Sequence, residues 1–133
     1  MLTNQWGRCP WSETWEKDKI HPSDLDKFIG IYSPYAVFEC IGSEDNYIKV
    51  RRGECKEIIC RVAPDLFQEI PEPKYKVGDT VLINDSVNAV IIANSWHSDK
   101  QEHYYFVTVN GKKKSRRYYE ADFSECQQES SIV

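Results

Sequence analysis

The sequence predicts a small, mainly β protein made of two short units, with a short helical segment at its N-terminus. Its 133 residues are 41% hydrophobic and 13% aromatic, which is enough for a buried core in small domains. Short apolar runs alternate with turn residues, a pattern typical of short strands. Two prolines at 71 and 73 indicate a boundary near the middle of the chain.

The N-terminal segment, residues 1–27, is rich in tryptophan. Trp11 and Trp15 stand four positions apart, so a short helix over residues 11–17 would place both rings on one face. A second helical piece is expected to end near residue 28. The tryptophan rings either cover an open end of the β core or anchor a partner protein.

The first β unit is expected to cover residues 28–70 and the second residues 74–123. Polar turns or loops are expected at 42–46 and 94–103. Asn110-Gly111 predicts a tight hairpin, because a type I′ turn needs positive φ at both central residues. The tail, residues 124–133, is polar and expected to fray. Strands are expected at 36–41, 47–51, 56–61, 75–83, 88–93, 104–109 and 112–119.

The two halves also align with each other, which predicts a tandem repeat. Residues 26–37 align with 79–90, and residues 47–63 align with 105–121. The order of strand, loop, strand, glycine turn and strand recurs in both halves. In the second half, the run Lys76-Val77-Gly78-Asp79, the tyrosine-rich strand and the terminal Asp122-Phe123 resemble small barrels of the SH3-like and Tudor-like kind. The resemblance implies two SH3-like units in tandem, the second clearer than the first, and implies architecture rather than activity.

Charge and cysteine content limit the functional classes. Residues 1–73 carry 9 Lys/Arg and 13 Asp/Glu, whereas residues 74–123 carry 8 and 6. A net charge of −4 is unfavourable for a general nucleic-acid binder. Five cysteines at scattered spacings, with no apolar leader in the sequence, indicate reduced thiols and a cytoplasmic protein.

No motif for catalysis or for cofactor binding stands out, so we expect a non-catalytic protein without cofactor or metal. Cys40 and Cys60 lie in apolar runs, where cysteine usually acts as a small hydrophobic residue. His97, Asp99 and His103 could converge on a divalent ion, but exposed loop histidines are the commoner case.

The basic run at residues 112–117 has three interpretations. It is a solvated edge hairpin, a surface for an acidic protein or nucleic acid, or a nuclear targeting signal. The tyrosines and Trp96 are interpreted as core residues, as a protein-binding face, or as an aromatic cage for a methylated side chain.

The resulting hypothesis is a bacterial protein that binds another protein. The segment at residues 109–119 is similar in style to bacterial immunity proteins, which implies neutralisation of a cognate, basic toxin by direct binding. The alternative is a Tudor-like or KOW-like module that binds nucleic acid or a modified protein tail through residues 112–119. The expected partner-contacting residues are Glu44, Asp45, Trp96, His97, Asp99, His103, Tyr104, Lys112, Lys114, Arg116 and Tyr118.

Overall fold

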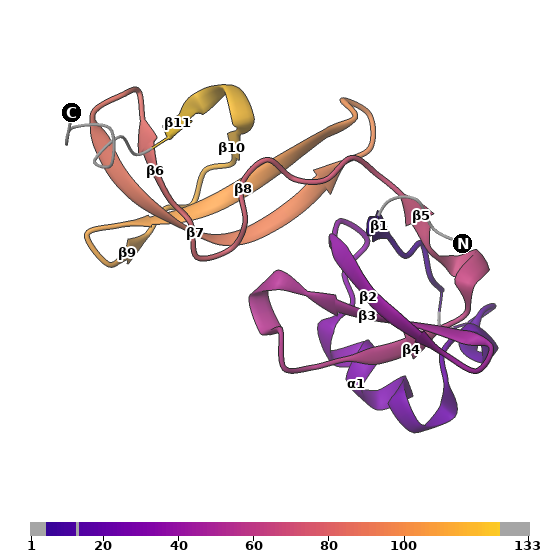
Figure 1. The fold of residues 1–133 in the computed structure, drawn as a ribbon. Helices are drawn as coiled ribbons and strands as arrows, with labels where there is room; N and C mark the ends of the chain where they lie inside the picture. Colours follow the sequence, from indigo (N-terminus) through magenta and orange to yellow (C-terminus); the bar gives the residue numbers. More distant parts are fainter. Residues whose placement is uncertain (1–4, 13, 126–133) are drawn as a thin grey trace. The chain divides into compact units, whose positions relative to one another are not determined.

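The computed structural model describes residues 5–12 and 14–125. The chain divides into two compact units, unit 1 over Met1–Glu72 and unit 2 over Pro73–Val133. Each unit is organised around one antiparallel sheet (Figure 1), so the prediction of a mainly β protein is confirmed. Among the described residues, no helix is long and apolar enough to cross a membrane.

Unit 1 has a sheet in the order β4-β3-β2-β1-β5. Because β1 pairs with both β2 and β5, the N-terminal segment forms part of this unit rather than a lead-in to it, and the unit begins before residue 28. Short 3-10 helices lie at Lys17–Lys19, Pro22–Asp24, Gly53–Cys55 and Pro64–Leu66. The other elements are β1 (Trp6–Arg8), α1 (Leu25–Ile31), β2 (Phe38–Glu44), β3 (Tyr47–Arg52), β4 (Cys60–Val62) and β5 (Gln68–Glu69).

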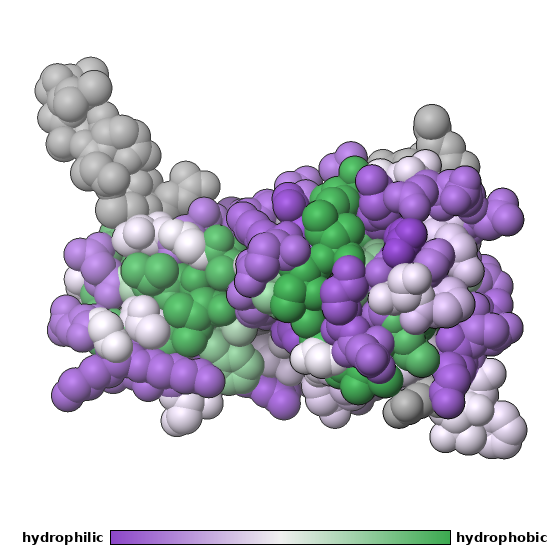
Figure 2. Space-filling model, turned by 90° about the horizontal axis from the view of Figure 1, so that it is seen from below, coloured by the Kyte–Doolittle hydropathy of each residue, from purple (hydrophilic) through white to green (hydrophobic). Residues whose placement is uncertain are grey.

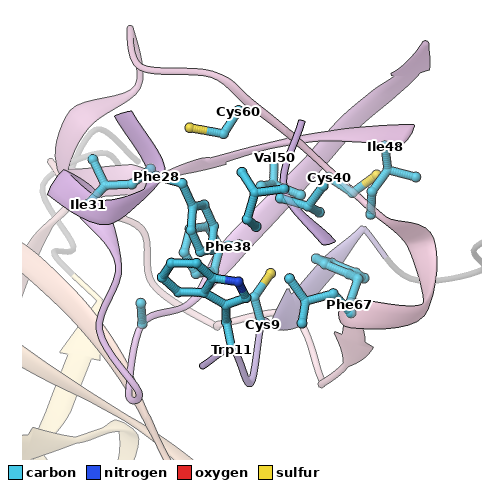
Figure 3. Close-up of a cluster of buried hydrophobic side chains, with 14 residues drawn as sticks. Cys9, Trp11, Phe28, Ile31, Phe38, Cys40, Ile48, Val50, Cys60 and Phe67 are labelled. Atoms are coloured by element: carbon cyan, nitrogen blue, oxygen red, sulfur yellow. The ribbon is translucent and has the colours of Figure 1, made fainter. Parts of the chain in front are cut away.

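Trp11 lies in the core of unit 1, and Figure 3 shows its ring beside Phe38 and Cys9. Its indole contacts the edge of Phe28 at 5.1 Å between ring centroids. The indole N–H donates to the carbonyl of Glu16 at 2.8 Å, which requires the chain to turn back on itself. The expected helix over residues 11–17 is therefore wrong. Trp15 points away from the core and is 82% exposed.

The segment before α1 covers the outer edge of β4. The His21 N–H donates to the carbonyl of Arg61 at 2.9 Å, and the Ala63 N–H donates to the carbonyl of Lys19 at 2.7 Å. Ile20, between these contacts, is 1% exposed. The insertion between β1 and β2 thus protects an edge that would otherwise present unpaired backbone groups.

Unit 2 has a sheet in the order β10-β8-β7-β6-β11, and β9 pairs with β8. Its core contains Tyr75, Tyr105, Val107 and Phe123. A 3-10 helix at Glu120–Asp122 precedes the last strand. The strands are β6 (Thr80–Ile83), β7 (Val87–His97), β8 (Glu102–Val109), β9 (Lys112–Lys113), β10 (Tyr118–Tyr119) and β11 (Phe123–Glu125).

Three expectations for unit 2 are corrected and one is confirmed. The strand expected at 75–83 is reduced to Thr80–Ile83. Residues 94–97 belong to β7, so the expected loop at 94–103 is reduced to a short turn. The expected strand over 112–119 is divided into β9 and β10 by residues 114–117. The hairpin at Asn110-Gly111 is confirmed, with φ of 53° and 77°.

The two sheets follow the same plan. β1 to β5 of unit 1 correspond in order to β6, β7, β8, β10 and β11 of unit 2, and a 3-10 helix precedes the last strand in each. The second strand carries a register shift in both, after Cys40 and after Ile91. The alignment of residues 26–37 with 79–90 is nevertheless wrong, because the former contains α1 and the latter contains β6.

Candidate binding surface

Tyrosine and phenylalanine side chains line the outer face of the unit 2 sheet. Tyr105 points into the core, so its neighbours Tyr104 and Phe106 point to the opposite face. Tyr119 lies opposite Tyr104 in the register and shares this outer face. The ring of Tyr104 lies 5.8 Å from that of Phe106 and 6.1 Å from that of Tyr119.

Basic side chains lie over these rings. The guanidinium of Arg117 lies 4.5 Å from the ring centroid of Tyr104, and the ammonium of Lys100 lies 4.6 Å from that of Tyr119. Lys113 pairs in the register with Thr108 on the same face. A contact between a cation and an aromatic ring at an exposed site contributes about 0.5–1 kcal/mol of stabilisation and holds the cation in a fixed position. We call this surface, formed by Lys100, Tyr104, Phe106, Lys113, Arg117 and Tyr119, the cationic face.

The register gives a residue-by-residue match with unit 1. Counting from the shift in the second strand, Tyr47 opposite Glu44 corresponds to Tyr104 opposite Ser95. Val62 pairs with the buried Ile48 of β3, and Tyr118 pairs with the buried Tyr105 at the equivalent position of β8. Val62 and Tyr118 are therefore equivalent. The residues just before them, Arg61 and Arg117, are therefore equivalent.

Two arginines on the equivalent face of unit 1 form ion pairs. Arg51 binds Glu39 at 3.1 Å, between a side-chain nitrogen and a carboxylate oxygen. Arg61 binds Glu44 at 3.0 Å and Asp24 at 2.8 Å. Unit 2 has Ser95 in the position of Glu44, and it lacks the insertion that carries Asp24.

The cations of the cationic face differ in this respect from the arginines of unit 1. Arg116 lies 4.4 Å from the ring centroid of Tyr118, and its ion pair with Asp122 is long, at 3.8 Å. Within residues 5–12 and 14–125, no carboxylate lies within ion-pair distance of Arg117 or Lys100. Lys112 and Lys114 are exposed on either side of Lys113. Among the described residues, Arg117 thus has no carboxylate partner, whereas the equivalent Arg61 has two.

The expected contact residues separate into three groups. Lys112, Lys114 and Arg116 are exposed beside the cationic face, and Tyr104 belongs to it, although its side chain is 4% exposed beneath Arg117. Asp45 is exposed at the turn between β2 and β3, but Glu44 is committed to Arg61. These two acidic residues belong to unit 1, so they do not form a common site within unit 2.

The third group lies on the β7–β8 hairpin or in the core. Trp96 and His103 face each other in the register and are 3% and 4% exposed, which corrects their expected position in a surface loop. Asn94 lies within 3.2 Å of Nδ1 of His103. His97 accepts a hydrogen bond from the Lys100 N–H, and Asp99 is exposed in the turn. Tyr118 is a core residue, 7% exposed.

Lys100, Phe106, Arg117 and Tyr119 were not among the expected contact residues. Alternation along β8 could have placed Phe106 on the face of Tyr104. The position of Arg117 over Tyr104 depends on the register between strands, which no local pattern reveals.

The described residues contain no group of three His, Cys, Asp or Glu side chains that could hold a metal ion. Burial raises the pKa of the Cys60 thiol to about 11, which opposes formation of a thiolate. Figure 3 shows the sulfur atoms of Cys9, Cys40 and Cys60 at separate places in the core.

Apolar surface is present but dispersed. Hydrophobic residues reach the surface in patches between hydrophilic ones (Figure 2). A pocket of about 490 Å³ in unit 1 is lined by Lys17, Asp18, Ile20, Pro22, Leu25 and Tyr47. The exposed large apolar side chains come from separate segments: Trp15, Ile29, Tyr35, Ile59, Val87 and Val90.

Comparison with known proteins gives one match. Residues 1–124 match the model of a family described as "Family of unknown function (DUF6960)". No curated protein and no solved structure matches the chain.

Proposed function

The chain belongs to the DUF6960 family, and we propose that it is a non-catalytic protein that binds an acidic partner protein through the cationic face of unit 2. The observation that carries the proposal is the position of Arg117 over Tyr104, with no carboxylate of the described chain as its partner.

Stacking prepares the guanidinium groups for binding. A guanidinium lying on a ring keeps its N–H groups available at its edge, where they match the two oxygens of a carboxylate. Arg116 on Tyr118 and Arg117 on Tyr104 are already held in place, so less side-chain entropy is lost when a partner binds.

A protein partner is favoured over a nucleic acid by two observations. Single-stranded nucleic acids stack their bases on open aromatic faces, but Tyr104 is 4% exposed and its ring is covered by Arg117. The whole chain carries a charge of −4, which repels a polyanion at long range, whereas a protein with a local acidic patch is repelled less. Nucleic acid is the second candidate, supported by the basic run at residues 112–117.

Neutralisation of a toxin is a finer form of the same proposal. The hypothesis of a basic toxin depends on the acidic net charge and on the loop around Glu44 and Asp45, of which Glu44 is paired with Arg61. If the partner is a toxin, we expect its contacting surface to be acidic. The resemblance of the two units to SH3-like barrels is also a proposal, and their shared strand order supports it.

The test measures binding of a fluorescently labelled peptide of alternating Asp and Ser by anisotropy. We expect the double variant Arg116→Ser/Arg117→Ser to bind about ten-fold more weakly or worse, since charge-assisted bidentate bonds are lost. The control Lys17→Ser/Lys56→Ser removes the same charge from exposed positions of unit 1 and should bind as the natural chain does.

A labelled oligothymidylate of matched charge separates the two candidates. Weaker binding of the oligonucleotide than of the peptide supports the protein partner. Tighter binding, with a steep loss as salt rises, would replace it with the nucleic-acid function. Equal weakening of peptide binding in both double variants would show that only net charge matters and would remove the proposed surface.

A further inference from the structure

Arg61 and Arg117 are equivalent, but the described part of unit 2 lacks the carboxylates that bind Arg61. In unit 1, Asp24 accepts hydrogen bonds from Nε of Arg61 at 2.8 Å, from Nη2 at 3.1 Å and from the Arg61 backbone N–H at 2.8 Å. Glu44 accepts a further bond from Nη1 at 3.0 Å. The guanidinium of Arg61 is therefore bound by two carboxylates, both supplied by its own unit.

The backbone edge beside Arg117, in contrast, is already satisfied by side chains. The Tyr119 N–H donates to Asp122 at 2.8 Å, where the equivalent Ala63 N–H of unit 1 donates to the carbonyl of Lys19. Nε of Arg116 donates to the carbonyl of Arg117 at 3.3 Å, where the equivalent carbonyl of Arg61 accepts from His21. Unit 2 therefore needs no added strand at this edge, and the guanidinium of Arg117 is the group left to be matched.

We propose that Arg117 is the specificity-determining residue of the cationic face and receives a single Asp or Glu carboxylate of the partner protein. This inference rests on the proposed function and names its central contact. The carboxylate takes the place that Glu44 and Asp24 fill for Arg61, and Ser95 is the position that leaves it open.

The position of Ser95 explains the difference between the units. Ser95 is half-buried on the outer face, opposite Tyr104, and Arg117 lies over the Tyr104 ring. A glutamate at this position would stand towards Arg117 as Glu44 stands towards Arg61. A short hydroxyl leaves the guanidinium open to a carboxylate from outside.

The test is the substitution Ser95→Glu in the full chain, which places a carboxylate of the chain itself near Arg117. We expect the internal carboxylate to compete for Arg117 and to weaken binding of the Asp-Ser peptide about ten-fold, while Arg117 itself is unchanged. The double variant Ser95→Glu/Arg117→Ser should then bind no more weakly than Arg117→Ser alone, because the two changes act on one contact.

Two controls separate this effect from size and from net charge. The glutamine of Ser95→Gln has nearly the same shape as the glutamate of Ser95→Glu but carries no charge. The Ser95→Gln variant should therefore bind the peptide as the natural chain does. Asn88→Glu adds the same charge at an exposed position further along the outer face of β7 and should weaken binding by less than about two-fold.

Each outcome decides the inference. Unchanged binding by Ser95→Glu would overturn it, as would an equal loss in Ser95→Gln or in Asn88→Glu. A chain that binds the peptide, loses binding in Arg116→Ser/Arg117→Ser and is indifferent to Ser95→Glu would keep the proposed function and reject Arg117 as its central contact. Absence of peptide binding by the natural chain would reject both.

Discussion

Asp24 and Arg61 form a bidentate ion pair that holds the insertion between β1 and β2 against β4, at the edge of the unit 1 sheet. The two contacts measure 2.8 Å and 3.1 Å, and Asp24 is only 3% exposed. Lys27 adds a longer contact at 3.3 Å. The pair joins the start of α1 to β4, two segments far apart in the sequence.

Replacing Asp24 by Asn should destabilise unit 1. The guanidinium of Arg61 would lose its main buried partner, and breaking such a pair costs about 3 kcal/mol of unfolding free energy. Urea unfolding followed by the amide resonances of unit 1 measures this loss. Asp26→Asn, at an exposed position of α1, is the matched control and should cost less than about 0.5 kcal/mol.

The same pair predicts a dependence of stability on pH. Hydrogen bonds from Arg61 and Lys27 hold the pKa of the Asp24 carboxyl well below its usual range, although burial opposes them. Because the folded pKa is lowered, the stabilisation is present above the unfolded pKa of about 4 and is lost as pH falls below it. The difference in unfolding free energy between the natural chain and Asp24→Asn should therefore shrink below about pH 4. A constant difference down to pH 2 would contradict this explanation of the pair.

Gly7 and Gly30 should respond in opposite ways to alanine. A Cβ at Gly7, in β1, would lie 2.5 Å from the carbonyl oxygen of Gln68 and 2.6 Å from the ring of Phe67. We expect Gly7→Ala to lower the unfolding free energy by about 2 kcal/mol or more, since the backbone of β5 must shift. A Cβ at Gly30, in α1, meets nothing within 4 Å, and Gly30→Ala should add about 0.5–1 kcal/mol. Thermal unfolding of both variants provides the comparison.

The thiols of unit 1 should differ in reactivity. Cys9, Cys40 and Cys60 are buried, and burial raises the pKa of Cys60 to about 11. Cys55 is half-buried, so iodoacetamide should alkylate it first among these four. Peptide mapping by mass spectrometry at successive times measures the order. Alkylation of Cys9 or Cys60 before Cys55 would contradict the packing described for this core.

Features determined by neighbouring residues were predictable from the sequence. The Asn110-Gly111 turn needs only the backbone preferences of two residues, and the structure has it there. The loop expected at 94–103 was wrong because Asn94 and His103 satisfy each other inside the sheet. Local polarity suggested solvent, whereas their partners lie across the hairpin.

The correspondence between the two units depends on strand register. The alignment of residues 47–63 with 105–121 is off by one to two residues, because the register matches Tyr47 with Tyr104 and Val62 with Tyr118. Residues 26–37 matched the wrong segment, because the insertion between β1 and β2 has no counterpart in unit 2. The expected contacts Lys112, Lys114 and Arg116 follow from a run of like charges, and all three are exposed. The relation of Arg117 to Tyr104 became visible only in the folded sheet.

The most direct test of the central claim is a titration of the full, ¹⁵N-labelled chain with the Asp-Ser peptide, followed by amide chemical shifts. The claim is that binding belongs to unit 2 because the equivalent charges of unit 1 are already paired. It predicts shifts that cluster around Lys100, Tyr104 and residues 112–119, with little change around Arg51 and Arg61. Shifts centred on unit 1, or spread evenly over both units, would contradict it.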